Sequence, residues 1–144
     1  MKQINFDMDG TLVNFYHVPS WLEYLMQEDT YPYEAAKPLL DMKRLTEEIN
    51  RLQLLGWEVN IISWVSKRAS KEYSARIRRA KIEWLRKYLP QVKFDHIHVI
   101  KYGTPKHRYA KGILFDDESG NRNEWKEIAF DEKNILNVLS KISY

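Results

Sequence analysis

The sequence contains no cysteine among its 144 residues, which excludes disulfide bonds and thiolate metal sites. No apolar run approaches the length of a membrane-spanning helix. Gly and Pro number only five each, and no segment has the low-complexity composition of a linker. The first expected strand begins almost at Met1 and leaves no room for a signal peptide, so we expect a cytoplasmic protein.

The composition favours one folded domain over residues 1–144. Hydrophobic residues make up 44% of the chain and aromatic residues 13%, which is typical of a compact globular protein and not of a disordered one. A chain of this length can bury a substantial core but is short for a two-domain enzyme. We therefore expect a single domain.

The positive charge is concentrated in one segment. Residues 67–87 contain nine Lys or Arg against two Glu, so this segment carries +7 and the rest of the chain −4. A basic helix beside an acidic remainder could attract phosphorylated small molecules or nucleic acid. The alternative is an ordinary solvated helix face.

Strand-like and helix-like segments alternate along the chain. The expected strands cover residues 2–7, 58–63, 94–100, 113–115 and 128–130, and the expected helices cover about 38–55, the basic segment up to Pro90, and the chain from about 132. This alternation predicts a three-layer α/β/α Rossmann-like domain with a central parallel sheet.

Two acidic residues follow the first expected strand. Asp7 and Asp9 lie two residues apart, and Gly10 next to them suits a tight turn. Carboxylates this close repel each other, so a cation is expected to compensate them.

Other polar residues also follow expected strands. Ser63 ends the second strand and Asp116-Asp117 the fourth, and parallel sheets bind ligands beyond these carboxyl ends. Four carboxylates in one crevice predict a Mg²⁺ site. Taken singly, the acidic pair is also consistent with a turn, and Ser63 with an ordinary strand end.

A phosphoryl group among these carboxylates requires a fixed positive charge. Lys106, ten residues before Asp116, is the candidate, although an isolated Lys on a short helix is usually solvated. Lys101, at the end of the third expected strand, is the rival.

The stretch Asp7-Met8-Asp9-Gly10-Thr11-Leu12 resembles the DxDGT(L/V) opening of the haloacid dehalogenase superfamily, most of whose members transfer phosphate. In that family the first Asp is the nucleophile and the second the general acid/base. The family order of DxD, Ser/Thr, Lys and an acidic pair is matched here by Asp7/Asp9, Ser63, Lys106 and Asp116/Asp117. The resemblance implies that Ser63 and Lys106 hold phosphate oxygens. It further implies that Mg²⁺ is held by Asp7, Asp116 and the backbone carbonyl of Asp9, with Asp117 acting through metal-bound water.

The turn from Tyr102 to Lys106 and the run into Asp116-Asp117 resemble the 5′(3′)-deoxyribonucleotidase branch of that superfamily. This resemblance favours Lys106 over Lys101 and implies a nucleoside monophosphate as substrate. Enzymes of that branch insert a helical cap after the first motif.

Here only residues 14–37 are available for a cap, enough for one helix and an aromatic loop. The expected helix starts with a capping box of Ser20 and Glu23 and is interrupted at Tyr31-Pro32-Tyr33. The aromatic residues could stack on a base or belong to the core. They are Phe15, Tyr16, Trp21, Tyr24, Tyr31 and Tyr33.

Such a reduced cap would leave the crevice open or require a lid from another subunit. Two alternatives to a nucleotidase therefore stay open. The first is a phosphatase acting on a nucleic-acid end or on another phosphorylated small molecule. The second is a non-catalytic phosphate- or protein-binding module of the same fold.

Overall fold

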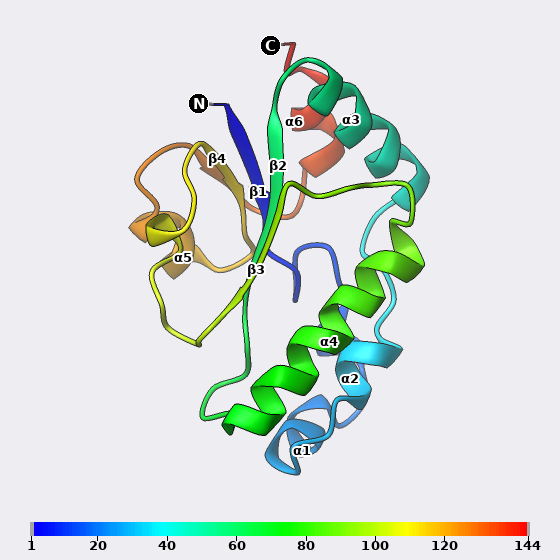
Figure 1. The fold of residues 1–144 in the computed structure, drawn as a ribbon, viewed down its shortest axis with the longest axis vertical. Helices are drawn as coiled ribbons and strands as arrows, with labels where there is room; N and C mark the ends of the chain where they lie inside the picture. Colours follow the sequence, from blue (N-terminus) through cyan, green and yellow to red (C-terminus); the bar gives the residue numbers. More distant parts are fainter. Residues whose placement is uncertain (1, 144) are drawn as a thin grey trace.

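The computed structural model describes residues 2–143 and contains a five-stranded sheet in the order β3-β2-β1-β4-β5 (Figure 1). The strands are β1 (Gln3–Phe6), β2 (Glu58–Trp64), β3 (His96–Ile100), β4 (Ile113–Phe115) and β5 (Ala129–Phe130). Every pair of neighbouring strands is parallel. All five carboxyl ends therefore lie at the same edge of the sheet.

Helices cover both faces of the sheet, as a parallel sheet requires. One face packs against α3 (Met42–Leu54), α4 (Lys71–Tyr88) and α6 (Ile135–Ser140). On the other face lie α5 (Ser119–Glu124) and the short 3-10 helix η2 (Lys106–Arg108), and the residues that pack on the sheet there, Trp125 and Ala110, come just after these helices. The prediction of a three-layer Rossmann-like domain is confirmed.

Alternating side chains of the strands supply the two halves of the core. From β2, Val59 and Ile61 enter the larger cluster beneath α3 and α4, whereas Ile62 enters the smaller cluster with Leu114 and Trp125. Side chains of successive strand residues point to opposite faces, so the adjacent Ile61 and Ile62 enter different halves of the core.

Local signals explain where the two long helices begin. The Asp41 side chain accepts hydrogen bonds from the backbone N–H groups of Lys43 and Arg44, and Ser70 caps α4 by accepting from the N–H of Tyr73. Such caps satisfy backbone donors that have no partner inside the helix. The helix expected over 38–55 thus starts four residues late, at Met42.

Residues 14–37 fold differently from the single helix that we expect. They form the 3-10 helix η1 (Phe15–His17) and two short helices, α1 (Trp21–Met26) and α2 (Tyr31–Ala35). Pro32 stands in the first turn of α2, where its missing N–H costs nothing, so it begins a helix and does not interrupt one. Ser20 has a left-handed backbone and, within the described residues, its side chain makes no capping hydrogen bond. The predicted capping box is therefore wrong.

The α1–α2 segment is fastened to α4 by hydrogen bonds. The Tyr73 hydroxyl donates to the carbonyl of Asp29 at 2.7 Å, and the Trp84 indole N–H donates to the carbonyl of Ala36 at 2.9 Å. At the rim, Ser70 donates through its backbone N–H and its hydroxyl to the Glu28 carboxylate. The segment is thus held along the length of α4.

Two further differences concern the C-terminal part. The closing helix begins at Ile135, three residues after the expected start. The short helix α5, which the sequence does not predict, occupies the stretch after the Asp116-Asp117 pair. Within residues 2–143, no helix combines the length and apolar character needed to cross a membrane.

Candidate active site

Asp7 and Asp9 lie at the carboxyl end of β1, the central strand. The chain turns sharply there, because the carbonyl of Met8 accepts the N–H groups of the three residues from Thr11 to Val13. Gly10 has a φ of +84°, and a Cβ atom at this position would lie 2.3 Å from the Asp117 Oδ2. Glycine is therefore required both by the backbone conformation and by the approach of the second acidic pair.

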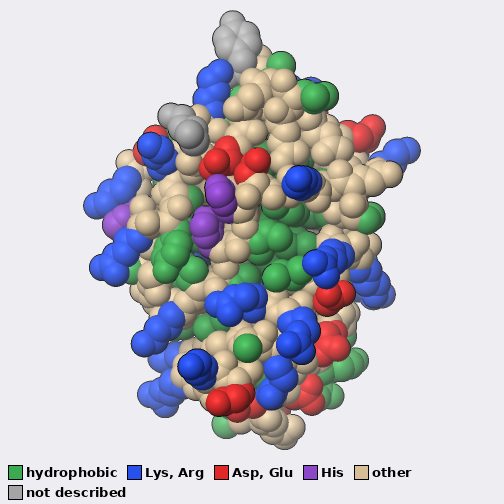
Figure 2. All heavy atoms as spheres, viewed as in Figure 1, with side chains coloured by type: hydrophobic (Ala, Val, Ile, Leu, Met, Phe, Trp, Pro, Cys, Tyr) green, Lys and Arg blue, Asp and Glu red, His purple; other side chains and the backbone are tan. Residues whose placement is uncertain are grey.

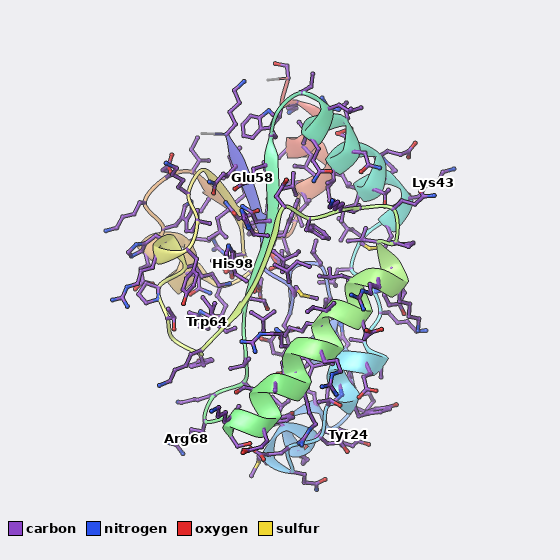
Figure 3. The ribbon with its side chains drawn as sticks, in the orientation of Figure 1. Tyr24, Lys43, Glu58, Trp64, Arg68 and His98 are labelled. Carbon is purple, nitrogen blue, oxygen red and sulfur yellow. The ribbon has the colours of Figure 1, made fainter. Side chains whose placement is uncertain are left out.

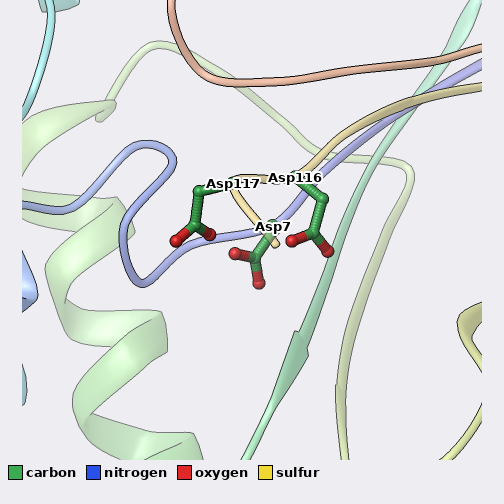
Figure 4. A group of neighbouring side chains, drawn as sticks. All are labelled: Asp7, Asp116 and Asp117. Carbon is green, nitrogen blue, oxygen red and sulfur yellow. The ribbon is translucent and has the colours of Figure 1, made fainter. Parts of the chain in front are cut away.

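Three carboxylates converge at this edge of the sheet. Asp7, from the end of β1, meets Asp116 and Asp117, from the end of β4, and each offers an oxygen within 4.8 Å of the others (Figure 4). The Asp9 side chain does not belong to this group. We call these three residues the three-Asp group.

Burial and mutual repulsion disturb the ionisation of the three-Asp group. Burial, followed by the charge of Asp7, raises the pKa of Asp117 to about 8. Burial and Asp7 also raise the pKa of Asp116 to about 6, against the opposing effect of Lys106. In the absence of a cation, the ionised forms of Asp116 and Asp117 are therefore unfavourable.

Lys106 lies between two members of this group. It is only 4% exposed and donates hydrogen bonds to Asp7 Oδ1 at 3.0 Å and Asp116 Oδ2 at 2.6 Å. Burial alone would lower the pKa of Lys106, but the two carboxylates raise it above the ordinary value. Lys101 is exposed, so Lys106 is the lysine that reaches the carboxylates.

Asp9 is paired with a second buried lysine, Lys81 of α4. The Lys81 Nζ donates to Asp9 Oδ2 at 3.0 Å, to Ser63 Oγ at 2.6 Å and to the carbonyl of Trp64 at 2.9 Å. Burial raises the pKa of Asp9, while the charge of Lys81 opposes this shift. The structure thus brings Asp9 and Ser63 together through one ammonium group.

The charge count alone does not predict the role of Lys81, because it treats the basic segment only as a charged surface. A sequence signal nevertheless exists. Lys81 follows Ile77 by four residues and precedes Trp84 by three, which places it on the apolar face of the helix. A lysine on such a face must find partners inside the protein.

Two residues of α5 also bind Asp116, and one of them shares the Oδ2 atom with Lys106. The Asn121 Nδ2 donates to Asp116 Oδ2 at 3.1 Å, and the Arg122 Nη1 donates to the backbone carbonyl of Asp116 at 2.9 Å. The Thr11 hydroxyl lies 3.1 Å from both Asp7 Oδ2 and Asp117 Oδ1 and joins the two acidic pairs. The orientation of the three-Asp group is therefore fixed by neighbours on several elements.

The chemistry of the three-Asp group fits Mg²⁺. The ion prefers oxygen ligands, usually takes only one or two carboxylates directly and keeps several waters. The raised pKa values of Asp116 and Asp117 show the repulsion that a divalent cation would relieve. Asp7, Asp116 and Asp117 are the residues that would hold it.

A cavity of about 530 Å³ opens above these groups. Its floor contains Asp7, Asp9, Ser63 and Lys106, and its walls are mostly apolar or aromatic. The wall residues come from residues 15–33, from the end of β2 and the β2–α4 loop, from the turn at Tyr102, and from Tyr73 of α4 and the start of α5. In Figure 3, Trp64 at the end of β2 and Arg68 in the loop after it mark this part of the wall. The cavity volume is within the range of about 300–1,000 Å³ found for small-ligand pockets.

Four of the six aromatic residues of the 14–37 segment line the cavity, whereas Tyr24 and Tyr31 belong neither to the cavity wall nor to the core. Phe15 and Tyr33 are buried and line the cavity from below, whereas Tyr16 is exposed at its edge. Burial, followed by the charge of Asp9, raises the pKa of both tyrosines beyond the ordinary value. Both hydroxyls are therefore neutral donors at physiological pH.

The basic residues of 67–87 have unequal surroundings. Lys81 is buried, and Arg76 and Arg78 donate to the backbone carbonyls of Glu28 and Val99. The other basic residues of this segment are exposed, and Figure 2 shows Lys and Arg side chains spread over this part of the surface, with acidic ones among them. Three basic residues of this segment, Lys81, Arg76 and Arg78, thus make hydrogen bonds that stabilise the fold.

No protein-family model matches the sequence, and no curated protein matches it. Solved structures do match its fold. A chain of the Pnkp1/Rnl/Hen1 complex superposes with a TM-score of 0.57 and 17% identity, over 91% of this chain and 45% of that one. The D,D-heptose 1,7-bisphosphate phosphatase from B. bronchiseptica, solved with magnesium and phosphate, matches with a TM-score of 0.52 and 16% identity, over 86% of this chain and 74% of that one.

These similarities show a shared fold. The chain therefore shares with these two proteins an α/β fold built on a central parallel sheet. It spans less than half of the chain from the Pnkp1/Rnl/Hen1 complex.

Proposed function

We propose that this protein is a Mg²⁺-dependent phosphomonoester hydrolase that forms an aspartyl-phosphate on Asp7. The observation that carries the proposal is the position of Asp7. Its carboxylate lies on the floor of the cavity, held by Lys106 and Thr11 and joined to Asp116 and Asp117. Under this proposal, a nucleophile, a fixed positive charge and a set of metal ligands meet at one point.

The reaction would follow from these positions in two steps. A carboxylate oxygen of Asp7 attacks phosphorus, the bond from phosphorus to the ester oxygen breaks, and Asp9 gives that oxygen a proton. Asp9 then takes a proton from a water molecule, which attacks the phosphoryl group and frees Asp7. Ser63 and Lys106 hold the phosphoryl oxygens, and bound Mg²⁺ would offset charge on the transferring group.

We propose a nucleoside monophosphate as the substrate. The cavity has the size of a small-molecule site, and aromatic side chains beside the floor, including Tyr16 and Trp64, could stack on a base. The presence of magnesium and phosphate in the structurally similar heptose bisphosphate phosphatase supports the general chemistry. The similarity of the Tyr102–Lys106 turn to nucleotidases supports the substrate class.

The proposal is tested by assaying nucleotides, sugar phosphates and phosphorylated oligonucleotides with Mg²⁺ or with a chelator. We expect Mg²⁺-dependent release of phosphate that is abolished by Asp7→Asn while the protein stays folded. Glu47→Gln, which removes an exposed carboxylate from α3, is the matched control. Activity retained in Asp7→Asn would disprove the nucleophile. Ligand binding without any hydrolysis by the wild type would favour a non-catalytic module.

A nucleic-acid end is the second candidate substrate, and the exposed basic residues around α4 favour it. Salt separates the two candidates. Hydrolysis at a polynucleotide end should become much slower with increasing ionic strength, because phosphate contacts release counterions. Hydrolysis of a mononucleotide should depend on salt only weakly.

A further inference from the structure

Lys81 differs from the rest of the basic segment in its burial. Among the nine Lys and Arg residues between 67 and 87, all of which the structure describes, only Lys81 is buried, with 1% of its surface exposed. It projects from the middle of α4 towards the ends of β1 and β2. Burying a lysine is unfavourable unless its charge and its donors are satisfied, so this placement requires an explanation.

The hydrogen bonds of Lys81 use its whole donor capacity. A lysine ammonium group has three N–H donors and no acceptor. They are directed to Asp9 Oδ2, Ser63 Oγ and the Trp64 carbonyl. No N–H group is left for a substrate oxygen, so Lys81 acts on the site through its neighbours.

The direction of the Lys81–Ser63 hydrogen bond has a chemical consequence. Ser63 accepts the bond, and Lys81 has no lone pair to accept one in return. The Ser63 hydroxyl proton is therefore free to be donated towards the cavity, where Ser63 lies on the floor. A phosphoryl oxygen is an acceptor of the kind that this hydroxyl can serve.

The two buried lysines divide the carboxylates of the site into two sets. Lys106 binds Asp7 and Asp116, whereas Lys81 binds Asp9. Asp9 is thereby held apart from the three-Asp group, and its side chain remains 17% exposed on the cavity side. An acid/base must face the leaving group and water, whereas metal ligands must face the ion.

We propose that Lys81 is a positioning residue that orients the acid/base Asp9, while Ser63 and the Trp64 carbonyl hold the Lys81 ammonium group in place. This inference rests on the proposed phosphatase function and adds a residue of α4 to its machinery. General acid catalysis contributes about 10²- to 10⁴-fold to such reactions, so a misplaced Asp9 should cost about 10²-fold or more. That cost depends on the leaving group, because a good leaving group needs little protonation.

The experiment compares Lys81→Met with the wild type in single-turnover assays. One substrate is a nucleoside monophosphate, whose leaving group is an alkoxide, and the other is 4-nitrophenyl phosphate. We expect the first reaction to slow by about 10²-fold or more and the second by less than about 10-fold. Lys43→Met, at an exposed position of α3, is the control (Figure 3).

A second comparison separates the loss of positioning from misfolding caused by an unpaired Asp9 charge. Lys81→Met leaves the Asp9 charge without its partner, whereas the double variant Asp9→Asn/Lys81→Met does not. If Lys81 acts through Asp9, the double variant should be no slower than Asp9→Asn alone with the nucleoside monophosphate. Equal slowing of both substrates by Lys81→Met, or losses that add in the double variant, would overturn the positioning role.

The outcomes separate the two proposals. A wild type that hydrolyses neither ester with Mg²⁺ refutes the phosphatase function and the role of Lys81 with it. A wild type that is active, with a Lys81→Met variant that keeps its rate on both substrates, refutes the role of Lys81 alone.

Discussion

Removing the charge of Asp117 should stabilise the metal-free protein, although Asp117 is a proposed metal ligand. The change is Asp117→Asn, which keeps an amide oxygen to accept the hydrogen bond from the Thr11 hydroxyl. In the wild type, burial and the neighbouring Asp7 charge raise the pKa of Asp117 to about 8. Ionised Asp117 is therefore unfavourable in the folded state.

The magnitude follows from this pKa shift. One pKa unit corresponds to about 1.4 kcal/mol, but the Asp117 carboxylate is partly solvated. Screening by water reduces the effect. We expect Asp117→Asn to raise the free energy of unfolding by about 1–2 kcal/mol at pH 8. The pKa of Asp117 in the folded protein lies above the unfolded value near 3.8. The free energy of unfolding of the wild type therefore decreases by this amount as the pH rises from about 4 to about 8. The difference in free energy of unfolding between Asp117→Asn and the wild type should increase over the same pH range and stay constant above it.

The assay is urea unfolding with a chelator at pH 5 and at pH 8. Glu47→Gln, at an exposed position, should change the free energy of unfolding by less than about 0.5 kcal/mol. Adding Mg²⁺ should stabilise the wild type more than Asp117→Asn, because only the wild type keeps the full ligand set. An Asp117→Asn variant that is less stable than the wild type at pH 8 without metal would refute the reasoning.

Two further substitutions test how the site is held. Gly10→Ala should cost about 1–2 kcal/mol of stability from its left-handed backbone, and it should also weaken Mg²⁺ binding measured by calorimetry, because the added Cβ displaces Asp117. Lys106→Met should cost about 3–5 kcal/mol in urea unfolding, because it leaves the buried Asp116 and Asp7 charges unpaired. Lys101→Met, at an exposed position, should leave stability unchanged, and similar losses in the two lysine variants would contradict the assignment of Lys106.

The parts of the fold that follow from the sequence are those set by local rules. Alternation of strands and helices predicts the parallel sheet, and polar residues after apolar runs predict its functional edge, where Asp7, Ser63 and Asp116 are brought together. The roles of these residues in catalysis stay predictions. Gly10 is placed correctly in a turn, because its positive φ is a local requirement.

The remaining features depend on contacts between distant segments. Helix α2 forms although Pro32 and its neighbours suggest a break, since α2 packs on α4 and Tyr33 is buried there. Helix α5 has no apolar periodicity and follows from the hydrogen bonds of Asn121 and Arg122 to Asp116. The partners of Lys81 on β1 and β2 become visible only once α4 is placed over the sheet.

The attachment of the 14–37 segment to α4 has a consequence for changing the specificity of this protein. Tyr73 and Trp84 anchor that segment, and Lys81, between them on the same helix, holds Asp9 and Ser63. A substitution that shifts α4 to reshape the cavity wall therefore also shifts groups on its floor. Substitutions at Tyr16, or at Lys67 and Arg68 in the β2–α4 loop, alter the wall without this link. Redesign of the substrate range should begin there and leave the buried face of α4 intact.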